Sequence, residues 1–232
     1  MNILGVNFSI HNEGVRFVLI LFGISMICLT FSTTLFWIFF ILSLFCGFFF
    51  RNPSRIVPDS EDLIVSPCDG TVCGICFESP NSDLGLGDEK RYRVSIFLSI
   101  LNVHVNRVPM SGKIKSILYH PGSFLNASLD KASVFNEKNT VVISLKDDPS
   151  KTMAFTQIAG MIARRIVCDL HEGQDIRKGD VYGIIRFGSR CDVWLPVGVV
   201  PQVIKGQRMI SGESIIADMR SEEKELRVGT LI

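Results

Sequence analysis

The feature that most constrains this fold is an uncharged, apolar run of 34 residues from Phe17 to Phe50. One transmembrane helix needs about 20 apolar residues, and the core of a signal peptide is much shorter than this run. Its only polar cluster is Thr30–Thr34, and each flanking half would reach about 22 Å, less than the ~30 Å hydrocarbon core. The run therefore predicts a membrane-embedded segment, either a shallow re-entrant hairpin or one long tilted helix.

The charges at the ends of this run indicate its orientation. Arg16 precedes the run, and Arg51 and Arg55 follow it directly. Because positive residues remain on the cytoplasmic side, we expect the chain in the cell (inner) membrane with the residues after Arg55 on the cytoplasmic face. The prolines and arginines of Phe48–Pro58 mark a boundary, so we predict an anchoring segment at 1–55 and one folded domain at 56–232.

The folded domain has the sequence pattern of strands. Tyr92, Val94, Ile96 and Leu98 alternate with other residues at the period of a strand. We expect a mainly β (α+β) fold with at most a short helix at Ser128–Phe135. Similar short apolar runs, bounded by Gly, Pro, Asn and Asp, occur at Ile64–Val65, Val72–Ile75, Ile114–Leu118, Val141–Leu145, Met153–Ile158 and Val181–Phe187.

One internal repeat refines this expectation. The segment EGQDIRKGDVYGII at Glu172–Ile185 is similar to KGQRMISGESIIAD at Lys205–Asp218, with two glycines six residues apart in each. Each copy resembles the hammerhead turn of lipoyl and biotinyl carrier domains, and SPCDGTV at Ser66–Val72 resembles the opening strand of such a unit. We therefore predict a barrel-sandwich, lipoyl-like β domain with quasi-two-fold symmetry.

Several function classes find no support. The net charge is +1, from 24 basic and 23 acidic residues, so nothing indicates a nucleic-acid partner. Cys68, Cys73 and Cys76 lack a second paired cluster, so no metal site is predicted. Motifs of serine hydrolases, P-loop proteins and zinc proteases are absent. Lys131 lies in a lipoylation-like tripeptide but far upstream of the paired turns, so a membrane-tethered carrier or adaptor is the weaker, non-enzymatic alternative.

Gly188-Ser189 interrupts the strand-like segment YGIIRFGSRCDVWLP at Tyr182–Pro196. A serine hydroxyl can attack the preceding carbonyl, and glycine offers no side chain to hinder that attack. The resulting backbone ester can undergo β-elimination, which breaks the chain and leaves a dehydroalanine that hydrolyses to a pyruvoyl group. On the dipeptide alone, the simpler interpretation is that Gly188 forms a bulge and Ser189 is an ordinary strand residue.

The surrounding motifs favour the chemical interpretation. Their order resembles the short bacterial and archaeal branch of the phosphatidylserine decarboxylases, from about Phe48 to Leu195. The motifs are RNP at 51–53, SPCDG at 66–70, FLSILNVHVNRVPMSG at 97–112, YHPGSFLNASLDKASVFNEKN at 119–139, GMIARRIVC at 160–168 and RFGSRCDVWLP at 186–196.

This resemblance implies a pyruvoyl-dependent decarboxylase made as a proenzyme. Ser189 would become the pyruvoyl cofactor, with Gly188–Ser189 as the scissile bond. The products would be a β chain of residues 1–188 and an α chain of residues 189–232, associated as a heterodimer or a larger assembly. The substrate would be phosphatidylserine in the membrane and the product phosphatidylethanolamine, a step of phospholipid biosynthesis.

The resemblance also implies roles for further residues. His104, in NVHVNRVP, would donate the proton that quenches the carbanion left by decarboxylation, and Asp69 would activate or orient the reacting groups. The alternative for His104 is a core histidine, and the alternative for Asp69 is an Asp-Gly turn. The longer branch has a second histidine where this chain has Arg107, so its Asp-His-Ser arrangement for self-cleavage is incomplete here. Arg107, Arg164 and Arg165 are candidates for the lipid phosphate because guanidinium suits phosphate.

Overall fold

The computed structural model describes residues 2–3, 6–122, 136–160, 165–186 and 189–229, with side chains from Ser9 onward. The chain divides into two compact units. The N-terminal unit contains Met1–Ser54 and Val103–Val105, and the β unit contains Arg55–Asn102 and Asn106–Ile232. Lys131, Arg164, Gly188 and the expected helix at Ser128–Phe135 lie outside the described residues.

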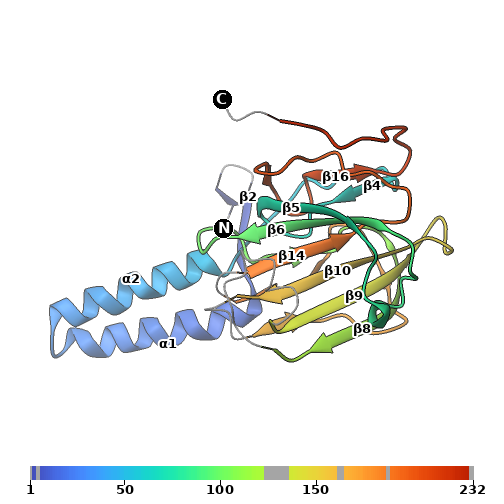
Figure 1. The fold of residues 1–232 in the computed structure, drawn as a ribbon. Helices are drawn as coiled ribbons and strands as arrows, with labels where there is room; N and C mark the ends of the chain where they lie inside the picture. Colours follow the sequence, from blue (N-terminus) through green and yellow to red (C-terminus); the bar gives the residue numbers. More distant parts are fainter. Residues whose placement is uncertain (1, 4–5, 123–135, 161–164, 187–188, 230–232) are drawn as a thin grey trace. The chain divides into compact units, whose positions relative to one another are not determined.

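The N-terminal unit contains a helical hairpin of α1 (Asn12–Leu29) and α2 (Thr33–Phe49), which lie side by side in Figure 1. The polar cluster breaks the apolar run, because Thr30 caps the end of α1 and the Ser32 hydroxyl accepts from the Leu35 N–H at 3.5 Å. The alternative of one long helix is therefore wrong. By length and composition α1 could cross a membrane, whereas α2 is apolar but shorter, at 17 residues.

A small antiparallel sheet completes the N-terminal unit. Its order is β1 (Asn2–Ile3), β2 (Val6–Ile10) and β3 (Arg51–Pro53). The Phe17 and Phe50 rings stack with their centroids 5.9 Å apart, and Phe49 and Phe50 are both buried. Aromatic packing of this kind fixes the end of α2 and the chain that follows it.

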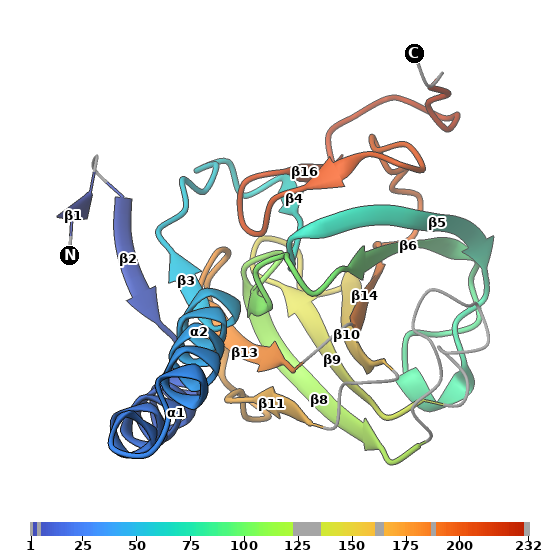
Figure 2. The same ribbon diagram turned by 90° about the vertical axis from the view of Figure 1, so that its left-hand side faces the viewer.

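The β unit is built on a curled antiparallel sheet of eight strands, whose curvature is visible in Figure 2. Its inner face carries the hydrophobic core, which includes Val94, Ile96, Leu98, Cys191 and Val193. In spatial order the strands are β12 (Asp175–Ile176), β8 (Gly112–His120), β9 (Lys138–Leu145), β10 (Thr152–Ala159), β14 (Ser189–Trp194), β6 (Arg91–Leu98), β5 (Gly70–Glu78) and β15 (Arg208–Met209).

Two smaller sheets and one short 3-10 helix complete the fold. A three-stranded sheet has the order β11-β13-β7, and its β11 and β13 pack against β10. A two-stranded sheet pairs β16 with β4. The bounds are β4 (Leu63–Val65), η1 (Ser82–Leu84), β7 (Val105–Arg107), β11 (Ile166–Cys168), β13 (Val181–Ile185) and β16 (Ile215–Asp218).

These elements confirm the predicted fold class. Every apolar run predicted as a strand lies in or overlaps one, and the alternating residues of Arg91–Leu98 form β6, an interior strand of the large sheet. The mainly β architecture, with two helices before it, is the expected α+β fold.

The internal repeat is also confirmed, at the level of backbone conformation. Both copies turn at two glycines with φ between 78° and 92°, a left-handed region that favours glycine. In each copy the side chain of the shared glutamine accepts a backbone N–H three residues earlier, Gln174 from His171 at 3.0 Å and Gln207 from Ile204 at 3.1 Å. The four glycines are Gly173, Gly179, Gly206 and Gly212.

The two turns bind, in the same way, the segments that precede β8 and β5. The Gly179 N–H donates to the Val108 carbonyl at 2.8 Å, and the Gly212 N–H donates to the Ser66 carbonyl at 2.8 Å. Consequently β12 pairs with β8 at one edge of the large sheet, and β15 pairs with β5 at the other edge. The segment starting at Val108 is thus the structural counterpart of the segment starting at Ser66, which gives the β unit its quasi-two-fold symmetry.

Candidate functional site

Ser189 is the first residue of β14, which lies at the centre of the large sheet. It pairs with Ala159 on β10 and with Leu98 on β6 and is fully buried. Its side chain points to the same face as Cys191 and Val193, the core face, because alternate residues of a strand share a face. The Ser189 Oγ has no hydrogen-bond partner among the described residues. A buried hydroxyl without a partner is unusual, and it leaves the oxygen lone pairs available for reaction.

The core near Ser189 holds neutral polar groups. The Asn106 amide donates to Cys191 Sγ at 3.8 Å and accepts from Gln157 at 2.9 Å, and the Asn139 amide donates to the Gln157 side chain at 3.3 Å. Burial raises the pKa of the Tyr182 hydroxyl well above its ordinary value, with the Cys191 thiol as a further cause. The groups around Cys191 therefore remain uncharged at neutral pH.

The opposite face of β14 carries a buried ionic network. The Arg190 guanidinium donates to the two oxygens of Asp192, Nε to Oδ1 at 2.6 Å and Nη2 to Oδ2 at 3.1 Å. Arg93 Nη1 donates to the same Oδ2 at 2.9 Å, and Arg93 Nε donates to Glu78 at 2.7 Å. Burial lowers the pKa of Arg93, but the Asp192 and Glu78 carboxylates outweigh it and hold the pKa above its ordinary value.

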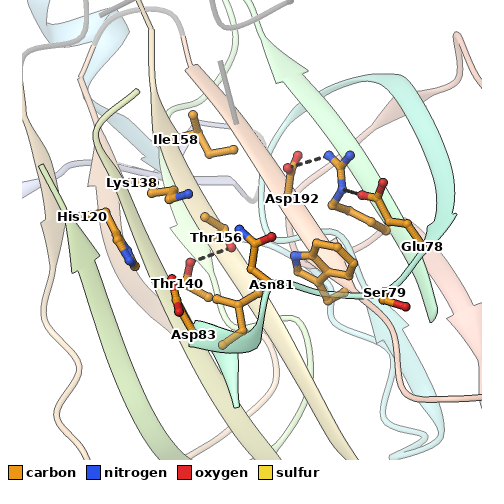
Figure 3. Close-up of a pocket in the computed structure, with 13 residues that line it drawn as sticks. Glu78, Ser79, Asn81, Asp83, His120, Lys138, Thr140, Thr156, Ile158 and Asp192 are labelled. Atoms are coloured by element: carbon orange, nitrogen blue, oxygen red, sulfur yellow. Dashed lines mark hydrogen bonds and ion pairs between the residues drawn. The ribbon is translucent and has the colours of Figure 1, made fainter. Parts of the chain in front are cut away.

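A polar cavity of about 370 Å³ opens on this outer face of the sheet. Figure 3 shows Lys138 and His120 on one side of the cavity and Asp192 and Glu78 on the other. Arg93 joins these two carboxylates by an ion pair with each. Asp192 lines the cavity and lies three residues after Ser189 on β14. Side chains an odd number of residues apart on a strand point to opposite faces, so the cavity lies on the face opposite to the Ser189 side chain.

His104 belongs to the N-terminal unit by its contacts. It is fully buried, and its imidazole packs against the Phe49 ring with the centroids 4.2 Å apart and an interplanar angle of 33°. This contact limits the orientation of the imidazole. Its role as proton donor stays a prediction.

Asp69 lies in the turn before β5 and has two kinds of partner. Both of its carboxylate oxygens accept from Arg55 Nη2 at 2.9 Å, and Oδ1 also accepts from the Ser211 N–H at 2.8 Å. In the other half of the β unit, the Ser111 hydroxyl accepts from the Lys178 N–H at 3.1 Å in the equivalent place. Asp69 therefore binds the turn at Ser211, and both its activating role and the Asp-Gly turn stay predictions.

The separation between Asp69 and Ser189 follows from the strand register. Ser189 pairs with Leu98 on β6, and Phe97 of β6 pairs with Thr71 on β5. The start of β5 is thus two strand spacings, or about 10 Å, from Ser189. Asp69 is near Ser189 but does not share a hydrogen bond with it.

The arginine candidates have different surroundings. Arg107 donates to the Gly179 carbonyl at 2.9 Å, and burial together with the nearby Arg55 charge lowers its pKa. The carboxylate of Asp69 acts in the opposite direction, so these two predicted site residues are close enough to interact. Arg165 is exposed, and its carbonyl accepts from the Arg186 N–H at 3.3 Å.

Comparison with known proteins relates this architecture to one enzyme family. Residues 42–217 match the family model described as phosphatidylserine decarboxylase. The chain belongs to the phosphatidylserine decarboxylase family. Relatives named phosphatidylserine decarboxylase proenzyme include that of Rickettsia akari, 56% identical over 173 residues, covering 75% of this chain and 74% of the relative. Another is that of Rickettsia typhi, 54% identical over 180 residues, covering 78% and 77%.

Membership of the phosphatidylserine decarboxylase family confirms the predicted family and the prediction of an enzyme. It disfavours the carrier or adaptor alternative. The match includes the segment around Ser189, His104 and Asp69, since all three lie within residues 42–217. The roles of these residues in this member of the family stay predictions.

Sequence reasoning missed the buried pair of Arg190 and Asp192. The signal was present, because Arg190 and Asp192 are two charged residues spaced by two within an otherwise apolar strand-like segment. This spacing places both on one face of a strand, and charged residues on a buried strand must be paired.

Proposed function

We propose that this chain decarboxylates phosphatidylserine to phosphatidylethanolamine, with a pyruvoyl group generated from Ser189 by cleavage of the Gly188–Ser189 bond. The observation that carries the proposal is the buried Ser189 Oγ, without a hydrogen-bond partner among the described residues, at the start of a central strand. Family membership supports the same assignment. Cleavage would give a β chain of residues 1–188 and an α chain of residues 189–232.

The proposed self-cleavage uses atoms of the chain and one water molecule. The Ser189 Oγ attacks the Gly188 carbonyl carbon, the amide C–N bond breaks, and the Ser189 nitrogen takes up a proton, which leaves an ester. Loss of the Ser189 Cα proton with breakage of the Cβ–O bond releases the Gly188 carboxylate and leaves a dehydroalanine. Water then replaces the amine nitrogen, which leaves as ammonia, and the pyruvoyl group remains. No oxidant or reductant is needed.

The fold suits a chain that is cut at this point. β14 begins at Ser189 and is hydrogen-bonded to β10 on one side and β6 on the other. β15 and β16 lie in the same 44-residue fragment and pair with β5 and β4. The fragment would therefore stay bound as an α/β heterodimer without a covalent link.

Ser189 is the residue that would carry the cofactor, and a pyruvoyl carbonyl there would supply an electron sink for loss of carbon dioxide from an amino acid head group. The neutral surroundings of Cys191 fit an uncharged ketone. We assign to His104 the return of a proton to the substrate carbon, because histidine titrates near neutral pH. Asp69 is the candidate for orienting the groups at the start of β5.

The lipid head group requires a cationic partner for its phosphate. Arg107 is the best supported of the three arginines, because burial and then the Arg55 charge lower its pKa, and a further anion beside the carboxylates of Asp69, Glu213 and Asp180 would favour its charged form. Arg165 is exposed and remains a second candidate, together with Arg164. The apolar helices α1 and α2 would hold the enzyme at the membrane that contains its substrate, with the β unit on the cytoplasmic face.

A lipid assay tests the proposed reaction. Full-length protein in vesicles that contain phosphatidylserine labelled at the serine carboxyl carbon should release labelled carbon dioxide and form phosphatidylethanolamine. Ser189→Ala should release none, and Arg107→Ala should raise KM with a smaller change in kcat. Wild-type protein that is cut at residue 189 but releases no carbon dioxide from this lipid would refute the assigned substrate.

A further inference from the structure

Arg190, the residue that follows Ser189, is almost completely buried, with 1% of its surface exposed. An arginine keeps its charge in proteins, so burial of its guanidinium is costly unless the charge is paired. A buried positive charge next to the proposed cleavage site is therefore a feature that the fold must compensate. The catalytic scheme above does not use it.

The compensation comes from two residues on the same face of the sheet. Asp192 accepts from Arg190 through both oxygens, at 2.6 and 3.1 Å, and the Ser95 hydroxyl accepts from Arg190 Nη2 at 2.7 Å. We call Arg190, Asp192 and Ser95 the Arg190 clamp. Its two-pronged geometry fixes the planar guanidinium more strictly than a single contact would.

The Arg190 clamp joins the two chains that cleavage would create. Arg190 and Asp192 lie in the fragment that begins at residue 189, whereas Ser95 lies on β6 in the larger fragment. Ser95 is directly opposite Asp192 in the register of β6 and β14. The clamp therefore fixes β14 against β6 within one residue of the scissile bond.

Ser189 itself has no such anchor, because its side chain faces the core and its Oγ has no partner among the described residues. Attack by the Ser189 hydroxyl requires placement of its oxygen within about 1 Å of the correct position. Placement must therefore come from the paired backbone and from the next side chain, which is held on the opposite face.

We propose that Asp192 is a positioning residue for self-cleavage, which acts by fixing Arg190 and through it the backbone of Ser189. This inference rests on the proposed function, since it assigns a residue to the maturation of the same site. It also predicts that the Arg190 clamp keeps the new end of the α chain in place after cleavage.

The test compares Asp192→Asn with a matched control, Glu78→Gln. Both variants replace a carboxylate that accepts from Arg93, but only Asp192 also contacts Arg190. Full-length proenzyme would be made by cell-free synthesis with lipid vesicles, and the appearance of the two fragments followed over time. We expect cleavage of Asp192→Asn to slow about tenfold or more, and that of Glu78→Gln to stay within about twofold of wild type.

A second variant separates positioning from stability. Arg190→Met leaves Asp192 paired with Arg93, so no carboxylate is buried alone, and folding can be checked in the uncut Ser189→Ala background. At a temperature below its unfolding transition, Arg190→Met should still cleave slowly, and Arg190→Lys should recover part of the rate. Wild-type rates in folded Asp192→Asn and Arg190→Met would overturn the inference. An uncut wild type would instead refute the proposed function itself.

Discussion

The two halves of the β unit share one template, and at one equivalent position one half has Ser111 where the other has Asp69. Each residue accepts a backbone N–H from the turn opposite, at 3.1 Å from Lys178 and at 2.8 Å from Ser211. A serine hydroxyl is thus sufficient for the turn. The carboxylate of Asp69 is an addition, and it binds Arg55 and acts on Arg107, next to the strands that carry the proposed cleavage site.

The largest effect that tests this shared template is expected at two equivalent glycines, Gly70 and Gly112, which both lie against backbone. A Cβ at Gly70 would lie 2.3 Å from the Phe97 carbonyl oxygen, and one at Gly112 would lie 2.3 Å from the Ser144 carbonyl oxygen. Because backbone must move in both cases, we expect Gly70→Ala and Gly112→Ala each to lower the free energy of unfolding by about 3 kcal/mol. Equilibrium unfolding in the Ser189→Ala background measures this without interference from cleavage.

Gly74 provides the control for both variants, because a Cβ there would meet its nearest neighbour, Ser95 Cβ, at 3.9 Å. Gly74→Ala should change the free energy of unfolding by less than about 0.5 kcal/mol. If Gly70→Ala were costly and Gly112→Ala harmless, the two halves would not share a template.

An intermediate effect is expected where the halves differ. Ser111→Ala leaves the Lys178 N–H without its acceptor and should cost about 1 kcal/mol. Asp69→Ser keeps a hydroxyl for the turn but leaves Arg55, whose side chain is 12% exposed, without its carboxylate, and should cost about 2 kcal/mol. Both values are measured by unfolding in the Ser189→Ala background.

The same Asp69→Ser change, in the cleavable chain, tests the chemical role of the carboxylate. If Asp69 activates or orients the groups at Ser189, cleavage of the folded variant should slow more than its stability loss explains. Cleavage at the wild-type rate would assign Asp69 to the turn and the Arg55 ion pair alone. Ser111→Ala is the matched control and should cleave normally.

The smallest effect concerns the pH dependence of stability. Lys178 donates its backbone N–H to Ser111, and Ser211 donates its backbone N–H to Asp69, but only the lysine side chain titrates. Burial lowers the pKa of Lys178 below its ordinary value, which nearby acidic residues such as Glu61 only partly offset. The folded state then binds this proton less tightly than the unfolded state, so stability rises as pH increases from the folded pKa to about 10.4. Ser211, the counterpart of Lys178 in the other half, carries no titratable amine.

Lys178→Met should remove this contribution. As the pH rises through the alkaline range, wild type should become more stable relative to Lys178→Met, as measured by the difference between their free energies of unfolding. Lys113→Met, at an exposed position, is the control and should show no comparable shift. A difference that is independent of pH would contradict the assigned effect of burial.

Much of the fold could be predicted from local pattern. The alternation around Ile96 predicted β6, and the glycine spacing of Gly173 with Gly179 predicted a turn that the backbone φ values confirm. The break of the apolar run could be located at Thr30–Thr34 but not interpreted, because two half-length helices and one long helix have the same composition. The capping by Ser32 decided between them.

The site was predictable only where chemistry is local in the sequence. Gly188-Ser189 is a contiguous pair, so its possible chemistry could be proposed from the sequence, and the resemblance to the decarboxylases favoured that chemistry over a simple bulge. The pairing of Asp69 with Arg55, and of Ser95 with Arg190, depends on which strands become neighbours, and that information is not contained in any single segment. Long-range register therefore determined the part of the site that sequence reasoning did not find.

We propose that Ser189 is both the point of self-cleavage and the source of the cofactor. Intact mass spectrometry of purified wild type beside Ser189→Ala tests it most directly. We predict two wild-type chains, with the smaller one beginning at residue 189 with the mass of a pyruvoyl group, and one uncut chain for the variant. A single uncut wild-type chain, or a smaller chain that begins at an intact serine, would show that Ser189 does not become the cofactor.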